Sequence, residues 1–268
     1  MKTILCPTDF TPGADRVSKY AAQLARDTDS KVILVAAHAQ KEKVAAGGFD
    51  LSDDADRLSE LHDLLSGSYH VPCGEEEPIN GNIYKKLSTV ADHYDLLVLG
   101  LQFGKEEGRK YSSGIDLVKM IQQTLAPLLV VPDQFEYKKI NRLLYAYDYK
   151  HEPDPPLMAL HWLADWFDVD VQFISVIPSN ISVQEENHIN EIQGKILHAW
   201  HHSRKLSIEN IVYDDVAQCL RNYLNRWSEG DLLILSVNHQ NLLKKIWHKS
   251  VVKGLLTGAT HPYMIIHK

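Results

Sequence analysis

The sequence predicts an α/β protein made of two tandem domains, each with a parallel sheet that helices cover on both faces. Continuous apolar runs alternate with helical stretches along the chain, as they do where parallel strands are buried on both sides. The same order of segments also occurs twice. The 268 residues, of which 44% are hydrophobic and 24% charged, have the length and composition of two globular domains.

Three segments of the first half recur, in the same order, in the second half. The matching pairs are 1–9 with 140–148, 95–100 with 231–236, and 127–131 with 262–266. The aspartates of the first two segments are 86 residues apart in the first half and 83 in the second. This repeat predicts one domain at 1–135 and a second, more divergent domain at 139–268.

Strands and helices are expected to alternate within each half. The expected strands are the apolar runs 31–36, 96–99, 128–131 and 169–176. Helices are expected where apolar residues recur every three or four positions. In the first half these stretches are 14–26, 52–65, 82–93 and 115–124, and in the second half they are 157–166, 183–205, 216–227 and 243–256.

The first helix of each half has the residues of a helix start. Thr11 offers an N-cap hydroxyl before Pro12, and Asp154 offers a carboxylate before Pro155. Each helix is therefore expected to begin soon after the strand that ends in an aspartate. Ligands of open parallel sheets bind beyond the carboxyl ends of the strands, so this turn is where a ligand site is expected.

Composition excludes several classes of protein. Lys and Arg number 28 against 35 Asp and Glu, a net charge of -7, which does not attract nucleic acid or anionic membranes. Cys6, Cys73 and Cys219 fit neither a disulfide framework nor a CxxC metal site and favour a reducing compartment. Neither a signal-peptide pattern nor an apolar run of about 18 residues is present. We therefore expect a cytoplasmic location, no membrane and no nucleic-acid partner.

The residues resemble a universal stress protein domain. The resemblance lies in the opening ILCPTDFT, KYAAQLA at 19–25, DLLVLG at 95–100 and APLLVVP at 126–132. It spans nearly the whole chain as two tandem copies and is stronger in the first. It implies an adenine-nucleotide alpha hydrolase-like, Rossmann-like fold with five parallel strands in each copy. It also implies that the last strands, 128–131 and 263–266, pair to join the copies as a pseudo-dimer.

The first copy holds the candidate nucleotide site. Nucleotide-binding members carry glycine, two residues, glycine, nine residues, then glycine and a hydroxyl residue, which bring backbone amides to the phosphates. The matching residues are Gly100, Gly104 and Gly114, but three residues separate the first two glycines and Ile115 replaces the hydroxyl residue. In relatives the acid after the first strand lies by the adenosine, which adds Asp9. Its structural alternative is hydrogen bonding to the backbone of the following turn.

The second copy has lost all three glycines of that pattern. The matching positions are Ser236, His239, Lys249 and Ser250, and Asp148 corresponds to Asp9. Side chains at the glycine positions crowd the amides that should face a phosphate, so these five residues are interpreted as a vestigial site. Lys249 and Ser250 still offer a charge and a hydroxyl to an anion.

Metal and catalytic motifs do not complete a site. His198, His201 and His202 lie at positions i, i+3 and i+4 of the helix expected at 183–205, a spacing that can bring two imidazoles to a metal. No CxxC or HExxH completes the set, so a solvated helix face and no metal are favoured. GxxxxGK[ST], GxGxxG and GxSxG are also absent, so no catalytic residue is assigned. The enzyme question stays open, with a non-enzyme favoured.

The leading expectation is a non-catalytic tandem universal stress protein with degenerate nucleotide sites. It would act in stress response or regulation through a protein partner, and association into a homo-oligomer is left open. The alternative is an ATP-binding, slowly hydrolysing switch in the first domain, which would make ATP its cofactor. A third hypothesis is a small-ligand or metal-binding protein that uses His239, Lys249 and the histidine-rich helix.

Overall fold

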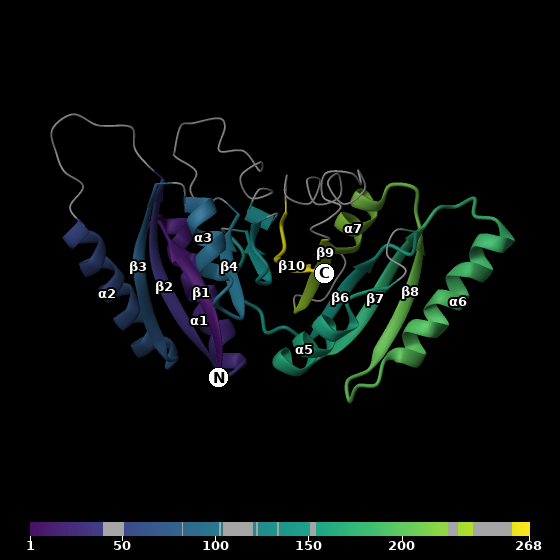
Figure 1. Ribbon diagram of the computed structural model, residues 1–268, viewed down its shortest axis with the longest axis horizontal. Helices are drawn as coiled ribbons and strands as arrows, with labels where there is room; N and C mark the ends of the chain where they lie inside the picture. The colour runs from purple at the N-terminus through teal and green to yellow at the C-terminus, as the bar shows by residue number, and fades with distance from the viewer. Residues whose placement is uncertain are drawn as a thin grey trace. The chain divides into compact units, whose positions relative to one another are not determined.

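The computed structural model describes residues 1–39, 51–81, 83–101, 103, 120–121, 123–132, 134–150, 154–224, 230–237 and 259–268 (Figure 1). The chain divides into two compact units. Unit 1 comprises Met1–Tyr137 and Thr260–Pro262, and unit 2 comprises Lys138–Ala259 and Tyr263–Lys268. Each unit contains a parallel sheet with helices, so the predicted α/β class is confirmed.

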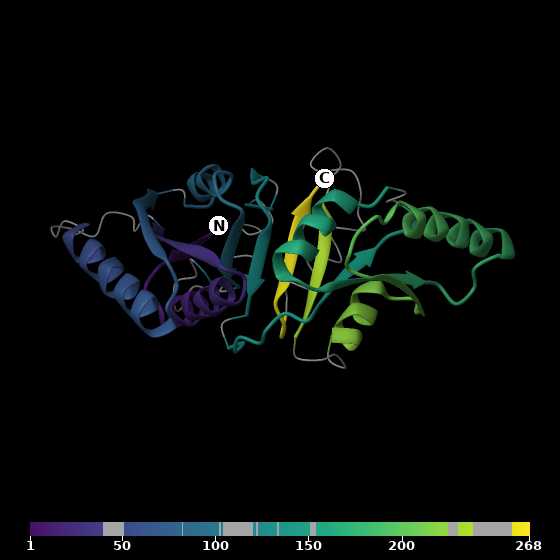
Figure 2. The ribbon, with the colours of Figure 1, turned by 90° about the horizontal axis from the view of Figure 1, so that it is seen from below.

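Unit 1 has the strand order β3-β2-β1-β4-β5, and every neighbouring pair is parallel. Its strands are β1 Lys2–Thr8, β2 Ser30–Ala39, β3 Cys73–Gly81, β4 Leu96–Gly100 and β5 Leu128–Val131. Its helices are α1 Pro12–Asp27, α2 Leu51–Tyr69 and α3 Ile83–Ala91. Figure 2 shows α1 and α2 on one face of this sheet and α3 on the other. The chain therefore changes its winding direction between β1 and β4, where ligands of such sheets usually bind.

Unit 2 has the order β10-β9-β6-β7-β8, again with parallel neighbours. Its strands are β6 Arg142–Tyr147, β7 Asp170–Ile177, β8 Leu206–Val212, β9 Asp231–Val237 and β10 Tyr263–His267. Its helices are α5 Leu157–Phe167, α6 Val183–Ala199 and α7 Val216–Leu224. In Figure 2, α5 and α6 lie on one face of the sheet and α7 on the other. Its winding direction changes between β6 and β9.

The core follows from the hydrophobicity of the central strands. Every residue of β4 and β5 is buried, as expected for strands that helices cover on both faces. The edge strand β8 instead mixes exposed and half-buried residues. The strands expected at 96–99, 128–131 and 169–176 are thus confirmed, with ends that differ by at most one residue.

The first helix begins as the sequence predicts. The Thr11 hydroxyl accepts a hydrogen bond from the Ala14 amide at 3.2 Å, and Pro12 occupies the first helical position. This contact satisfies one of the amides that a helix start leaves without a partner in the helix. The buried face of α1, which includes Val17, Tyr20 and Leu24, then packs on the sheet.

The segment after β5 packs back on α1. The buried ring of Tyr20 meets the ring of Tyr137 edge to face, with their centroids 5.0 Å apart, and lies 6.5 Å from that of Phe135. The Tyr137 hydroxyl also donates to Asp27 at 2.8 Å. Unit 1 therefore continues past its last strand to Tyr137.

Two expectations in unit 2 are wrong. Helix α5 begins at Leu157 with Pro156 at the N-cap and no side-chain cap, so Asp154 does not cap it. The second proline explains the later start, because a residue that precedes proline disfavours helical geometry. Helix α6 ends at Ala199 rather than near residue 205, because the following turn has its own side-chain hydrogen bonds and leads into β8. His201 and His202 are therefore not on a helix.

Several expectations lie outside the described residues. They are most of the helix at 115–124, the helix at 243–256, and the site residues Gly104, Gly114, Ile115, His239, Lys249 and Ser250. Within the described ranges, no helix is both long enough and apolar enough to cross a membrane.

Candidate functional site

The candidate site of unit 1 lies where β1 and β4 end. These strands are parallel neighbours, with Ile4 beside Leu96 and Leu5 beside Leu97. The register places Gly100, the last residue of β4, at the same edge of the sheet as Asp9, which follows β1. Two of the four residues predicted for this site therefore share one edge of the sheet.

Asp9 orders the turn into α1. Its Oδ1 atom accepts hydrogen bonds from the Thr11 amide at 3.1 Å and from the Thr11 hydroxyl at 2.7 Å. The Thr11 oxygen in turn accepts the Ala14 amide. This relay from carboxylate to hydroxyl to amide matches the structural alternative that the sequence offered for Asp9. One carboxylate oxygen is thus already used within the protein.

Phe10 links the same turn to Arg57 of α2. Its backbone has a φ of 57°, a left-handed conformation that costs a non-glycine residue about 1 kcal/mol. Its amide donates to the Thr8 hydroxyl at 3.0 Å, and its carbonyl accepts from Arg57 Nη2 at 3.3 Å. The Arg57 guanidinium also lies 4.2 Å from the centroid of the Phe10 ring. These contacts offset the backbone cost and fix the path of the turn.

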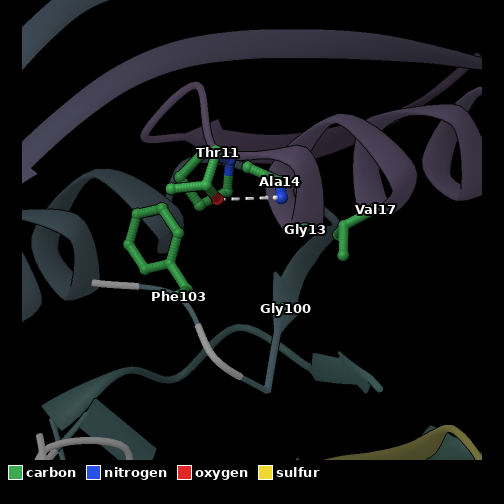
Figure 3. Close-up of a pocket in the computed structure, with 7 residues that line it drawn as sticks. Thr11, Gly13, Ala14, Val17, Gly100 and Phe103 are labelled. Carbon is green, nitrogen blue, oxygen red and sulfur yellow. Dashed lines mark hydrogen bonds between the residues drawn. The ribbon is translucent and has the colours of Figure 1, made fainter. Parts of the chain in front are cut away.

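A small pocket lies between the start of α1 and the end of β4 (Figure 3). Its lining residues are Pro7, Thr11, Gly13, Ala14, Val17, Gly100 and Phe103. Tyr84 of α3 fixes one wall, because its hydroxyl donates to the Phe103 carbonyl at 3.1 Å. The volume of about 10 Å³ is close to that of a single water. The pocket is therefore far smaller than a nucleotide.

In unit 2, Asp148 makes a turn like that of Asp9. It is buried, and its Oδ1 atom accepts the Lys150 amide at 3.1 Å. Lys150 pairs with Glu185 of α6 at 3.0 Å, and this hydrogen bond raises the pKa of the lysine. The charge of Lys150 at this turn is therefore paired with that of Glu185.

Ser236, at the position of the first motif glycine, is hydrogen-bonded inside unit 2. Its buried hydroxyl accepts from the Tyr145 hydroxyl at 2.8 Å. Tyr145 lies beside Phe173 in the sheet, with ring centroids 4.8 Å apart. The corresponding neighbours in unit 1 are the smaller Cys6 and Leu34. Two rings thus fill the space under the carboxyl end of β6 that smaller side chains occupy in unit 1.

The histidines do not form the arrangement that the sequence offered. His198 lies in the last turn of α6, whereas His201 and His202 follow the helix. The side chain of His202 is only 9% exposed, so a solvated helix face is also wrong for this residue. In the described ranges no group of three or more His, Cys, Asp or Glu side chains is placed to hold a metal ion.

Cys6 has the environment of an inert thiol. It is fully buried, and burial raises its pKa to about 12, although Ser18 at 3.7 Å opposes this. Cys73 and Cys219 are also free thiols, and burial raises the pKa of each. None of the three thiols is poised as a nucleophile at neutral pH.

Four residues that line or contact the candidate sites were not among the predicted site residues. In unit 1 they are Thr11 and Phe103, and in unit 2 Tyr145 and Phe173. Tyr145 was detectable, because the repeat aligns it with the much smaller Cys6. Phe103 was not, since its position depends on the path of the chain after β4.

Comparison with known proteins gives a family match and a fold. Residues 1–132 match the universal stress protein family. No curated protein matches the chain. The fold is similar to that of a universal stress protein from Archaeoglobus fulgidus DSM 4304, with a TM-score of 0.66 and 12% identity over 99% of this chain and 98% of that chain.

Two Pseudomonas aeruginosa structures are also similar. One, from strain UCBPP-PA14 and assigned to the universal stress proteins, has a TM-score of 0.60 and 16% identity over 100% of this chain and 93% of that chain. The other, a protein of unknown function from strain PAO1, has a TM-score of 0.58 and 14% identity over 100% of this chain and 92% of that chain. Such low identities establish the fold alone. The family match covers residues 1–132, just under half of the 268 residues, and these residues form a universal stress protein domain.

Proposed function

We propose that this chain is a non-catalytic universal stress protein with degenerate nucleotide sites, which acts in stress response or regulation through protein contacts. The proposal rests on the geometry of the candidate site in unit 1. The carboxylate of Asp9 is bonded to Thr11, and the pocket beside Gly100 has room for about one water. A nucleotide at this position would require both Thr11 and Phe103 to move.

Unit 2 supports the same proposal from different residues. The Ser236 hydroxyl accepts from Tyr145, and the rings of Tyr145 and Phe173 pack below it. This position lacks the glycine that would let backbone amides approach a phosphate. A phosphate would also have to displace a buried hydrogen bond.

A groove in unit 2 supports the protein-contact part of the proposal. It lies between the start of α5 and one face of α6 and has a volume of about 810 Å³. Leu157, Ile192 and Ile196 give it an apolar floor, and Met158 beside it is 86% exposed. Lys150 and Lys195 line its edge. An apolar floor with a charged edge is typical of protein interfaces.

The nucleotide part is tested by calorimetric titration of the nucleotide-free chain with magnesium-ATP. We expect no saturable heat up to millimolar ATP, with folding verified by circular dichroism. Saturable binding near one site per chain, lost in Asp9→Ala and kept in Asp63→Ala, would overturn the proposal. It would favour an ATP-binding switch in unit 1. Asp63 is the matched control because its side chain is 79% exposed and belongs to α2.

The protein-contact part is tested by isolating a partner and mapping its binding. Met158→Lys should weaken binding of that partner at least tenfold, because it places a charge beside the apolar floor of the groove. Leu64→Lys, at an exposed leucine of unit 1, should bind as the unmodified chain does. Equal binding by all three chains would exclude the groove as the contact surface. The expected pairing of the two copies and any homo-oligomer stay predictions.

A further inference from the structure

A cluster of rings joins α5 to the segment between α6 and β8. The ring of His161, on α5, stacks on that of His202, with centroids 4.9 Å apart and planes at 21°. Trp200 meets His161 edge to face at 4.2 Å and lies 5.4 Å from His202. We name His161, Trp200 and His202 the histidine stack. It lies at the end of α6, away from the residues proposed for the nucleotide sites.

Hydrogen bonds fix the protonation state of His202. The Arg204 amide donates to its Nδ1 atom at 3.0 Å, so this nitrogen is an acceptor and carries no proton. The other nitrogen, Nε2, then carries the proton and faces Asp165 Oδ1 at 3.0 Å. Both nitrogens of a neutral His202 are therefore satisfied. A second proton would have to go to Nδ1, where it would displace the Arg204 amide.

The segment 200–205 depends on these contacts to stay on α5. Trp200 Nε1 donates to the Arg204 carbonyl at 2.8 Å, which closes the turn. The Arg204 guanidinium pairs with Asp168, the residue that caps the end of α5. A ring stack, a partly buried hydrogen bond and one ion pair thus hold the turn.

His161 is suited to the neutral form. Its Nε2 atom is buried and has no hydrogen-bond partner among the described residues. Burial lowers its pKa, the neighbouring His202 and His201 lower it further, and Asp165 opposes them. A protonated His161 would place a poorly solvated charge against a parallel imidazole.

We propose that the histidine stack is an acid-sensitive latch, which holds segment 200–205 on α5 at neutral pH and releases it at mildly acidic pH. The lowered pKa of His161 sets the direction. A released imidazole titrates near its ordinary value of 6.5 and the latched one titrates lower, so the open form binds more protons below 6.5. The stability of the latch is complete above 6.5 and is lost as the pH falls from there through the lower value.

The charges around the stack define its balance. Asp165 of α5 contacts His202 of the stack directly. Other charged or titratable groups on the neighbouring described elements are Asp168 of α5, His198 of α6, His201, Arg204 and Lys205 of the segment, and Asp170 of β7. Of the two carboxylates of α5, Asp168 pairs with Arg204, whereas Asp165 faces His202 and opposes the lowering of the pKa of His161. The charge that acidification adds to the imidazoles is therefore only partly compensated.

Hydrogen exchange on the intact chain tests the latch. The measured quantity is the protection of the amides in residues 200–206 at pH 7.5 and pH 5.5, corrected for the intrinsic dependence of exchange on pH. We expect protection to fall several-fold between pH 7.5 and pH 5.5, because the open form binds more protons than the latched form below 6.5. His161→Phe keeps a ring and removes the proton site, so its protection should change by less than about twofold. His188→Gln, at an exposed histidine of α6, should behave as the unmodified chain does.

A second variant keeps the test decisive if His161→Phe does not fold. His202→Asn preserves an acceptor for the Arg204 amide and removes one of the groups that lower the pKa of His161, so it should weaken the dependence on pH. Unchanged protection of the unmodified chain between the two pH values would overturn the proposal. A loss of protection that is as large in the folded variants as in the unmodified chain would overturn it as well.

Discussion

The guanidinium of Arg142 holds both carboxylate oxygens of Asp231, through Nε at 3.2 Å and Nη2 at 2.7 Å. The remaining nitrogen, Nη1, donates to Gln172 at 2.6 Å, whose amide donates to Glu209 at 2.6 Å. Tyr223 of α7 donates to the same Glu209 carboxylate. One row of polar side chains therefore crosses four neighbouring strands of unit 2, and Arg142 is its central member.

Replacing Arg142 should destabilise unit 2 strongly. Arg142→Leu leaves the carboxylate of Asp231, whose side chain is 2% exposed, without its cation. Because the Arg142 side chain is 38% exposed, breaking this half-buried ion pair from one side should cost about 2 kcal/mol, which urea unfolding followed by circular dichroism measures. The control is Lys195→Leu, which removes an exposed ion pair with Glu191 and should leave the midpoint unchanged. An equal, small effect of both variants would contradict the role of the row.

The hydrogen bond between Tyr145 and Ser236 should be measurable as a coupling energy. Tyr145→Phe and Ser236→Ala each remove one side of the bond and preserve the ring or the backbone. In a double-mutant cycle from urea unfolding we expect a coupling of about 1 kcal/mol, typical of a buried neutral hydrogen bond. Strictly additive effects would show that the two hydroxyls do not stabilise each other.

Asp9 should contribute to stability through its oxygen rather than its charge. Asp9→Ala removes the acceptor of the Thr11 amide and hydroxyl, so the free energy of unfolding should fall by about 1 kcal/mol. Asp9→Asn keeps Oδ1 in place and should lose less than half of that. Thermal unfolding of both variants checks this order. The reverse order would mean that the negative charge itself stabilises the start of α1.

Cys6 should resist thiol reagents in the folded chain. With a pKa of about 12, about one molecule in ten thousand carries the thiolate at pH 8. A chain with Cys73→Ser and Cys219→Ser isolates this thiol, and Ellman's reagent should modify it only after urea unfolding. Any slow labelling of the native chain should accelerate about tenfold per pH unit. Rapid labelling at pH 8 would contradict the buried, protonated state.

The sequence predicts the central strands well because helices bury both of their faces. Continuous apolar runs such as Leu96–Gly100 have no polar face to turn to solvent, so they are buried in the core. The side-chain hydroxyl of Thr11 and the ring of Pro12 act locally, so the start of α1 is also predictable. The edge strands escape prediction. Cys73–Gly81 carries three glutamates and a proline, which only a strand with one free edge tolerates.

The end of α6 and the space at the candidate sites depend on contacts that the local sequence does not specify. Nothing in the helical periodicity of 183–205 shows that Trp200 bonds the Arg204 carbonyl instead of continuing the helix. Likewise, the spacing of Gly100 and Gly104 describes a loop but not the position of Phe103, which Tyr84 of α3 fixes. Sequence patterns placed Asp9 and Gly100 at one edge, and tertiary packing decided the space between them.

The aromatic contacts after β5 determine where unit 1 can be cut. The family match ends at residue 132, but Phe135 and Tyr137 cover the buried ring of Tyr20, and Tyr137 bonds Asp27. A truncation at residue 132 would expose the ring of Tyr20 on α1 and leave an apolar surface that favours aggregation. A truncation after Tyr137 keeps that ring covered, and it is the natural end point for expressing unit 1 alone.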